Sequence, residues 1–119
     1  MLIGKLWKMK SENIPEIITL CGSTKFKKQF IEINKMLSLE GKIVLSVGLF
    51  NHADSENITK DQKKMLDELH LRKIDLSDSI YVIDVDGYIG ESTQREINYA
   101  RDKSKDIIYY SNQVKNDKP

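Results

Sequence analysis

Glu96 is the residue of this chain whose type and position most directly suggest chemistry. It follows a loop that contains Gly87 and Gly90, and that loop comes directly after the apolar, β-branched run of residues 79 to 84. Such a run predicts a buried strand that leads into a loop and then a helix. Open α/β sheets bind ligands at this kind of strand end, and glycines let the backbone approach a ligand closely. We therefore expect a carboxylate at the mouth of a sheet.

Two interpretations of Glu96 follow from its spacing. Ser92 or Thr93 can cap the helix, and Thr93 with Glu96 fits a capping box, in which the glutamate only bonds back to the helix start. Alternatively the carboxylate acts as a nucleophile or base at the ligand edge. Its position in the first turn would lower its pKa, whereas burial beside Tyr88 would raise the pKa. The spacing alone leaves both interpretations open.

A second candidate is the turn Gly22-Ser23-Thr24-Lys25, which joins a predicted strand to a helix. Free backbone N–H groups at the helix start, two hydroxyls and an ammonium suit a phosphate or carboxylate. The turn lacks the full P-loop pattern and the Gly-x-Gly-x-x-Gly pattern, so neither an ATPase nor a dinucleotide enzyme is indicated. The alternative is that Ser23 or Thr24 only caps the helix while the lysine is solvated.

His52, His70 and Lys73 form the third candidate group. No His-x-x-x-His or paired cysteine spacing exists, so we expect no zinc or other metal site. His70 could be a hydrogen-bonded core residue or a catalytic group. An unpaired ammonium is costly inside a core, so Lys73 indicates a site edge or a subunit interface. Its candidate partners are Asp67, Asp75 and Asp78.

The elements that must position these groups alternate along the chain. Strands are predicted at residues 17–21, 43–47, 79–84 and 107–110, and helices at about 26–40, 59–77 and 93–103. Short turns between alternating elements imply a parallel sheet with right-handed crossovers. The predicted fold class is therefore α/β, a three-layer Rossmann-like (flavodoxin-like) domain with a small, mainly parallel sheet.

The helices carry apolar stripes that we expect to face this sheet. In the first helix the stripe is Phe26, Phe30, Ile33 and Leu37, and Gly41 is expected to end the helix in a left-handed conformation. In the second helix the expected inward residues are Met65, Leu66, Leu69 and Leu76, and in the third they are Ile97 and Ala100. The long connection from Gly48 to Ile58 contains His52.

Composition indicates a single domain over residues 1–119. A chain of 119 residues with 39% hydrophobic content can build one core, and its net charge of +1 gives no field that favours nucleic acid or anionic membranes. Residues 1–15 are an N-terminal arm without a clear assignment, and residues 112–119 form a polar tail that we expect to fray. Cys21, the single cysteine, is expected to be an inert core thiol of a reduced, cytoplasmic protein without a signal peptide or membrane span.

Three segments of the chain together resemble a known superfamily. These are Cys21-Gly22-Ser23-Thr24-Lys25-Phe26, the run from Leu66 to Asp75, and Gly87 to Glu96 with Tyr99-Ala100. Over residues 17–110 the chain resembles the small uncharacterised branch of the nucleoside 2-deoxyribosyltransferase and deoxynucleoside 5'-monophosphate N-hydrolase superfamily. The resemblance implies that Glu96 is a nucleophile, that Ser92 and Thr93 lie near the sugar, and that Ser23 and Lys25 lie near a 5'-phosphate.

The chain also departs from the superfamily pattern. The deoxyribosyltransferases have an aspartate six residues before the nucleophile, and Gly90 occupies that position here. The resemblance therefore favours hydrolysis over transfer between bases. A general acid for the departing base would come from one of four candidates, namely Asp84, Asp86, Glu91 and His70.

The sequence thus predicts an enzyme that hydrolyses the N-glycosidic bond of a (deoxy)nucleoside or its 5'-monophosphate, with a non-catalytic nucleotide-binding sensor or scaffold as the alternative. A plain interaction domain is a third possibility. The expected catalytic residues are Glu96 and His70, and the expected substrate-binding residues are Gly22, Ser23, Thr24, Lys25, Asp84, Gly87, Tyr88, Gly90, Ser92 and Thr93. We expect no cofactor, metal, nucleic-acid or membrane partner.

A homodimer or higher homo-oligomer is expected on two grounds. Trp7, Tyr99, Tyr109 and Tyr110 supply more large aromatic surface than one small core needs. The superfamily resemblance implies assemblies in which subunits complete each other's sites.

Overall fold

The protein is an α/β domain built on a parallel sheet, as predicted, and its computed structural model describes residues 14–48 and 57–117. Within those residues the sheet has four strands in the order β2-β1-β3-β4, all parallel. The strands are β1 (Ile17–Gly22), β2 (Ile43–Leu45), β3 (Ser79–Ile83) and β4 (Asp106–Tyr109). The helices are α3 (Lys27–Leu39), α5 (Lys60–Leu76), α6 (Glu91–Asp102) and α7 (Tyr110–Asp117), with two short 3-10 turns, η1 (Thr24–Phe26) and η2 (Val85–Gly87).

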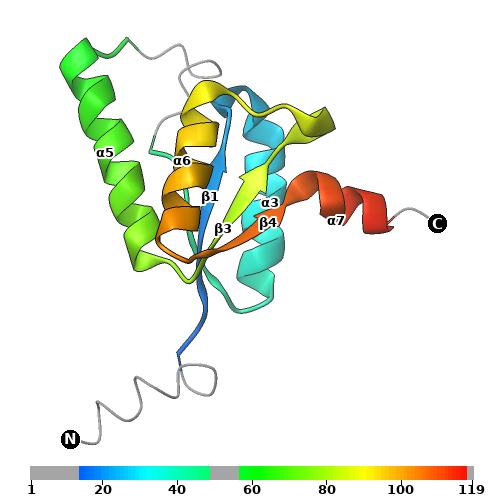
Figure 1. The fold of residues 1–119 in the computed structure, drawn as a ribbon. Helices are drawn as coiled ribbons and strands as arrows, with labels where there is room; N and C mark the ends of the chain where they lie inside the picture. Colours follow the sequence, from blue (N-terminus) through cyan, green and yellow to red (C-terminus); the bar gives the residue numbers. More distant parts are fainter. Residues whose placement is uncertain (1–13, 49–56, 118–119) are drawn as a thin grey trace, which may run out of the picture.

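Helices cover both faces of the sheet, which gives the expected three layers (Figure 1). On one face α3 and the start of α7 pack against the strands, and on the other face α5 and α6 do. Because side chains alternate along a strand, Ile18 and Leu20 enter the first core and Cys21 enters the second. Both β1 and β3 are buried on both faces, which explains why they are continuous apolar runs in the sequence.

The first helix confirms its predicted stripe. Phe30, Ile33 and Leu37 are buried against the sheet, and Phe26 packs on the same core from η1. Gly41 follows the helix with φ +87°, the left-handed conformation that favours glycine.

Helix α5 has the predicted ends but not the predicted inward face. Thr59 caps it through a capping box with Gln62. However, Met65, Leu69 and Leu76 are exposed, and the fully packed residues are His70 and Ile74. A helix of 17 residues is about 25 Å long. Its N-terminal end therefore extends past the short strands (Figure 1).

The end of the chain also differs from the prediction. β2 and β4 are shifted or shorter by one or two residues, and residues 110–117 form α7 instead of a frayed tail. The reason is a buried anchor, since the Asp84 carboxylate accepts hydrogen bonds from the Ser111 backbone N–H (2.8 Å) and hydroxyl (2.7 Å). Tyr110 additionally packs on the α3 core.

Two predictions concern residues outside the described ranges. One is Trp7 with the rest of residues 1–13, and the other is His52, within residues 49–56. Among the described helices, none combines the length and the apolar character that crossing a bilayer would require.

Candidate functional site

A cavity of about 570 Å³ opens at the carboxyl ends of the strands. It lies where the chain turns out of β1 and β3, the point at which strand order reverses and at which open α/β sheets bind ligands. The segments after β1, β2 and β3 form part of its wall, and α5 and α6 form the rest. Its lining comprises Gly22, Ser23, Thr24, Val47, Gly48, Lys63, Leu66, Asp67, Leu69, His70, Lys73, Tyr88, Gly90, Glu91, Ser92, Thr93 and Glu96.

The turn after β1 forms one wall of this cavity. Gly22 is required there, because a Cβ atom would lie only 2.9 Å from the Ile83 carbonyl oxygen. Ser23 caps η1 and accepts a hydrogen bond from the Lys25 backbone N–H, at 3.4 Å. Lys25 itself lies outside the lining, with its ammonium 3.6 Å from the centroid of the Tyr88 ring. Of the residues predicted to bind a phosphate, Gly22, Ser23 and Thr24 therefore line the cavity, and Lys25 does not.

The loop after β3 brings Glu96 to the cavity in a way that spacing did not predict. Asp86 and Gly87 both adopt positive φ values of 54° and 80°, which turn the chain. Gly90 is the residue before α6, and no side chain caps this helix. Glu96 therefore lies in the second turn, so the predictions of a Ser92 or Thr93 cap, of a capping box and of a first-turn carboxylate are wrong.

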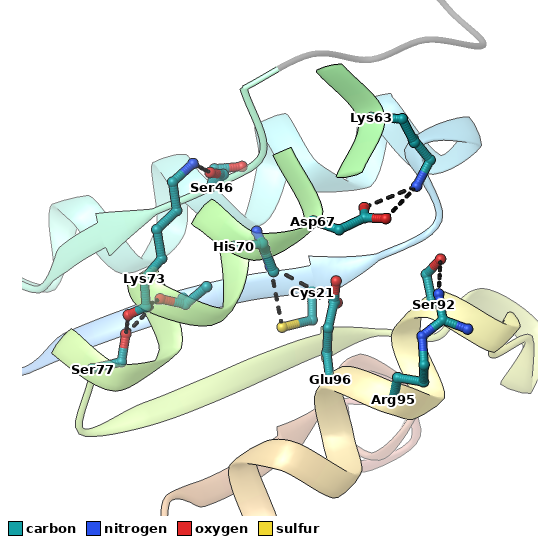
Figure 2. A network of polar contacts seen from close by, with 11 residues as sticks. Cys21, Ser46, Lys63, Asp67, His70, Lys73, Ser77, Ser92, Arg95 and Glu96 are labelled. Carbon is teal, nitrogen blue, oxygen red and sulfur yellow. Dashed lines mark hydrogen bonds and ion pairs between the residues drawn. The ribbon is translucent and has the colours of Figure 1, made fainter. Parts of the chain in front are cut away.

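Three polar side chains meet beneath the cavity, one each from β1, α5 and α6 (Figure 2). The Cys21 Sγ lies 3.5 Å from the His70 Nε2, and the same nitrogen lies 3.8 Å from the Glu96 Oε1. The Cys21 Sγ also lies within 4.8 Å of a Glu96 carboxyl oxygen. All three donor atoms lie within 4.8 Å of one another, so Cys21, His70 and Glu96 are the described group that could hold a metal ion.

Burial controls the protonation of this cluster. It raises the pKa of Glu96 to about 7, against a smaller lowering effect of the neighbouring Cys21 thiol. Burial, followed by the nearby Lys73 charge, lowers the pKa of His70 to about 4. Burial and the neighbouring Glu96 also raise the pKa of the Cys21 thiol well above its usual value. At neutral pH the imidazole is uncharged, the thiol is protonated, and the carboxyl is poised between its two states.

The charged groups around the cluster have partners of their own. The Lys63 ammonium lies 2.8 Å from the Asp67 carboxylate on the next turn of α5. Lys73 donates to the Ser46 carbonyl oxygen at 2.6 Å, which resolves how its ammonium is tolerated at the site edge. The aspartates suggested as its partners bond elsewhere. Asp67 binds Lys63, Asp75 binds Tyr99, and Asp78 accepts from the Ile17 backbone N–H.

The predicted site residues divide into two groups. Both predicted catalytic residues, Glu96 and His70, line the cavity with seven of the predicted binding residues, namely Gly22, Ser23, Thr24, Tyr88, Gly90, Ser92 and Thr93. Lys25, Asp84 and Gly87 lie outside the lining. Of the suggested general acids, Asp84 anchors Ser111 and Asp86 is outside the lining, which leaves Glu91 and His70 at the cavity.

Sequence reasoning missed Cys21 as a site residue. The prediction of a buried thiol is confirmed, since Cys21 is fully buried, but the thiol contacts His70 and lies within 4.8 Å of Glu96. Alternation along β1 indicates only which face Cys21 occupies. No local motif connects it to His70 and Glu96, because the three residues come from separate elements.

Comparison with known proteins adds no family assignment. No family model matches the chain, and no curated protein matches it.

Proposed function

We propose that this protein hydrolyses the N-glycosidic bond of a (deoxy)nucleoside or its 5'-monophosphate, with Glu96 as nucleophile. The observation that carries the proposal is the position of the Glu96 carboxyl. It lines the cavity at the topological switch point, its side chain is 17% exposed, and His70 and Cys21 lie beside it. A carboxyl that is both accessible and desolvated suits attack on a carbon centre.

The reaction proceeds in two displacements, as in retaining glycosidases. The Glu96 carboxylate attacks the anomeric carbon, the C–N bond breaks, and the base departs with the bonding electrons and accepts a proton from a general acid. Water then attacks the anomeric carbon of the resulting ester and loses a proton to a base. This step releases the sugar and restores the carboxylate.

Cys21 and His70 act on the nucleophile and not on the substrate. The Cys21 thiol lies within 4.8 Å of the Glu96 carboxyl and lowers its pKa, which favours the ionised form of the nucleophile. His70 is nearly fully buried behind the carboxyl, so it is a positioning residue in this mechanism. Besides Glu96, the carboxylates in the lining are Glu91 and Asp67. Glu91 is the proposed general acid, because Asp67 is ion-paired with Lys63.

The rest of the lining is compatible with a nucleotide. The Ser23 and Thr24 turn presents hydroxyls and the N-terminus of η1, which suit a phosphate or a sugar hydroxyl. Leu66, Leu69 and Val47 supply apolar wall area, and the Tyr88 ring is exposed at the rim, where a planar base can stack.

The direct test is chromatography of a panel of nucleosides and mononucleotides after incubation with the purified protein. We expect release of free base from at least one deoxynucleotide, and a loss of at least about a thousandfold in rate for Glu96→Ala. Glu32→Gln, an exposed carboxylate on α3, is the matched control and retains the rate. No base release at any protein concentration, or an active Glu96→Ala protein, would refute the assignment.

A nucleotide-binding sensor without turnover is the second candidate. The observation in its favour is the scarcity of proton donors, because Asp67 is ion-paired and His70 is uncharged at neutral pH. Loss of general acid catalysis lowers rates by about 100- to 10,000-fold. Calorimetric binding of a nucleotide without release of its base identifies this case. Binding that Ser23→Ala does not weaken would show that the β1 turn is not the phosphate end.

A further inference from the structure

We propose that Cys21, His70 and Glu96 form a binding site for a thiophilic divalent metal ion, with Zn²⁺ as the best fit, and that occupancy of this site blocks the nucleophile. The proposal concerns metal binding, which can be measured without a substrate. Only its inhibitory consequence rests on the proposed function.

The positions of the three donors match the size of a zinc ion. Zn–S and Zn–N bonds of about 2.3 and 2.0 Å in tetrahedral geometry separate sulfur and nitrogen by about 3.5 Å. The Cys21 Sγ and His70 Nε2 are 3.5 Å apart. The Nε2 to Glu96 Oε1 distance is 3.8 Å, and the three donor atoms lie within 4.8 Å of one another, so the carboxylate must move toward the other two donors to complete the triangle.

The environment of these donors also favours a transition metal over calcium or magnesium. Thiolate and imidazole are ligands of zinc and its neighbours, whereas Mg²⁺ and Ca²⁺ take oxygen ligands. Cys21 is fully buried and His70 is 6% exposed, so the packing of β1 and α5 fixes both before an ion arrives. Glu96 and His70 line the cavity, which gives an ion an entry path and leaves room for water as a further ligand.

Metal binding follows a balanced exchange. The aquated ion loses water, the Cys21 thiol and any protonated Glu96 carboxyl give their protons to solvent, and the thiolate, the imidazole nitrogen and the carboxylate bind the ion. The Glu96 oxygen that would attack an anomeric carbon is then bound to the metal. The loaded protein should therefore be inactive as a hydrolase, and a chelator should restore its activity.

Optical titration with Co²⁺ tests the site directly. The chain contains one cysteine, so a near-ultraviolet thiolate-to-cobalt charge-transfer band in the metal-free protein can arise only from Cys21. We expect a saturable band at one Co²⁺ per chain and its loss on addition of one equivalent of Zn²⁺. Cys21→Ser should abolish the band, and His70→Gln and Glu96→Gln should each weaken Co²⁺ binding at least about tenfold.

His52→Gln is the matched control, because His52 is the other histidine of the chain and is not one of the three proposed ligands. It should bind Co²⁺ as the wild type does, and circular dichroism checks that every variant is folded. Absence of the band in folded wild-type protein would overturn the proposal. A band that both His70→Gln and Glu96→Gln leave unchanged would also overturn it, since the thiol would then bind alone.

Inhibition of the hydrolase by the bound metal is measured separately. If the protein releases base from a nucleotide, Zn²⁺ should suppress that rate in the wild type and not in Cys21→Ser, each measured against its own metal-free rate. Metal binding without any base release would leave the site intact and refute only the hydrolase. Base release that a bound equivalent of Zn²⁺ leaves unchanged would refute the inhibition.

Discussion

Glu96 and His70 are neighbours whose protonation is shifted in opposite senses by the same cause. Burial disfavours charge, so it raises the pKa of the Glu96 carboxyl to about 7 and lowers the pKa of the His70 imidazole to about 4. The pair is therefore not a salt bridge at neutral pH, although its atoms are 3.8 Å apart. The contact therefore adds little to stability, and in the proposed mechanism it places a neutral imidazole beside a desolvated carboxyl.

This arrangement predicts a pH-dependent effect of Glu96→Gln on folding. The pKa of Glu96 is raised on folding from 4.5 to about 7. Its favourable contribution is therefore complete below pH 4.5 and is lost as the pH rises through 7. Glutamine does not titrate, so the variant should gain stability relative to the wild type, by up to about 3 kcal/mol, between about pH 5 and pH 8.

Urea denaturation of both proteins across that range measures the difference. The contribution of His70 to stability changes with pH in the opposite sense. Its pKa falls on folding, so this contribution is lost as the pH drops from 6.5 through about 4. It is present in both proteins and largely cancels. A difference in unfolding free energy that is constant with pH would contradict a buried, neutral-leaning Glu96.

At the scale of elements, α5 and α6 on one face of the sheet and α7 at the end of the chain are held in different ways. Tyr99 of α6 donates to Asp75 of α5 at 2.6 Å and accepts from Arg72, so exposed side chains join α5 to α6. α7 instead depends on the buried Asp84 carboxylate at the end of β3, which binds Ser111 through two hydrogen bonds. Asp84 is thus a structural residue, although its place after β3 suggested substrate binding.

Asp84→Asn should destabilise the protein by about 1–3 kcal/mol, because an amide cannot accept from both Ser111 groups as a carboxylate does. Thermal denaturation measures the effect. Ser111→Ala removes only the hydroxyl bond and should cost less. If Asp84→Asn leaves the melting temperature at the wild-type value, the anchor is not what orders α7.

The sequence predicted the elements well because the strands are buried on both faces. Continuous β-branched runs identified β1 and β3, and the period of Phe30, Ile33 and Leu37 identified α3. The inward face of α5 was wrong, because the helix is rotated so that His70 and Ile74 pack on the sheet while Met65, Leu69 and Leu76 are exposed. The Thr93 cap was wrong because α6 begins at Glu91, two residues earlier than its hydroxyl-containing residues suggested. The Cys21 contact depends on packing between three elements, which no local pattern reports.

At the scale of the whole molecule, the exposed apolar side chains of α5 bear on the expected oligomer. Three of the aromatic residues from which an oligomer was expected have partners within the chain, since Tyr99 is hydrogen-bonded and both Tyr109 and Tyr110 pack on cores. Met65 and Leu76, in contrast, are 54% and 67% exposed. Apolar side chains gathered on one helix indicate a protein–protein contact.

We expect a homodimer that buries α5, with a mass about twice the 13.8 kDa of the chain. Met65→Glu combined with Leu76→Glu should give a monomer in multi-angle light scattering. Ile31→Glu is the control, because Ile31 is 58% exposed on α3, on the opposite face of the sheet. A wild-type monomer at micromolar concentration, or dimer loss with Ile31→Glu alone, would contradict a dimer through α5.

In the proposed mechanism, Glu96 forms a covalent bond to the sugar. Incubation with a 2'-fluoro analogue of a cleaved nucleotide, whose fluorine slows both displacements, should trap the glycosyl-enzyme ester. Mass spectrometry of the digested protein then identifies the peptide that carries the ester. We predict a mass gain of the sugar phosphate on the peptide that contains Glu96. Label on the Asp67 or Glu91 peptide, or base release from the analogue without label on any peptide, would contradict Glu96 as the nucleophile.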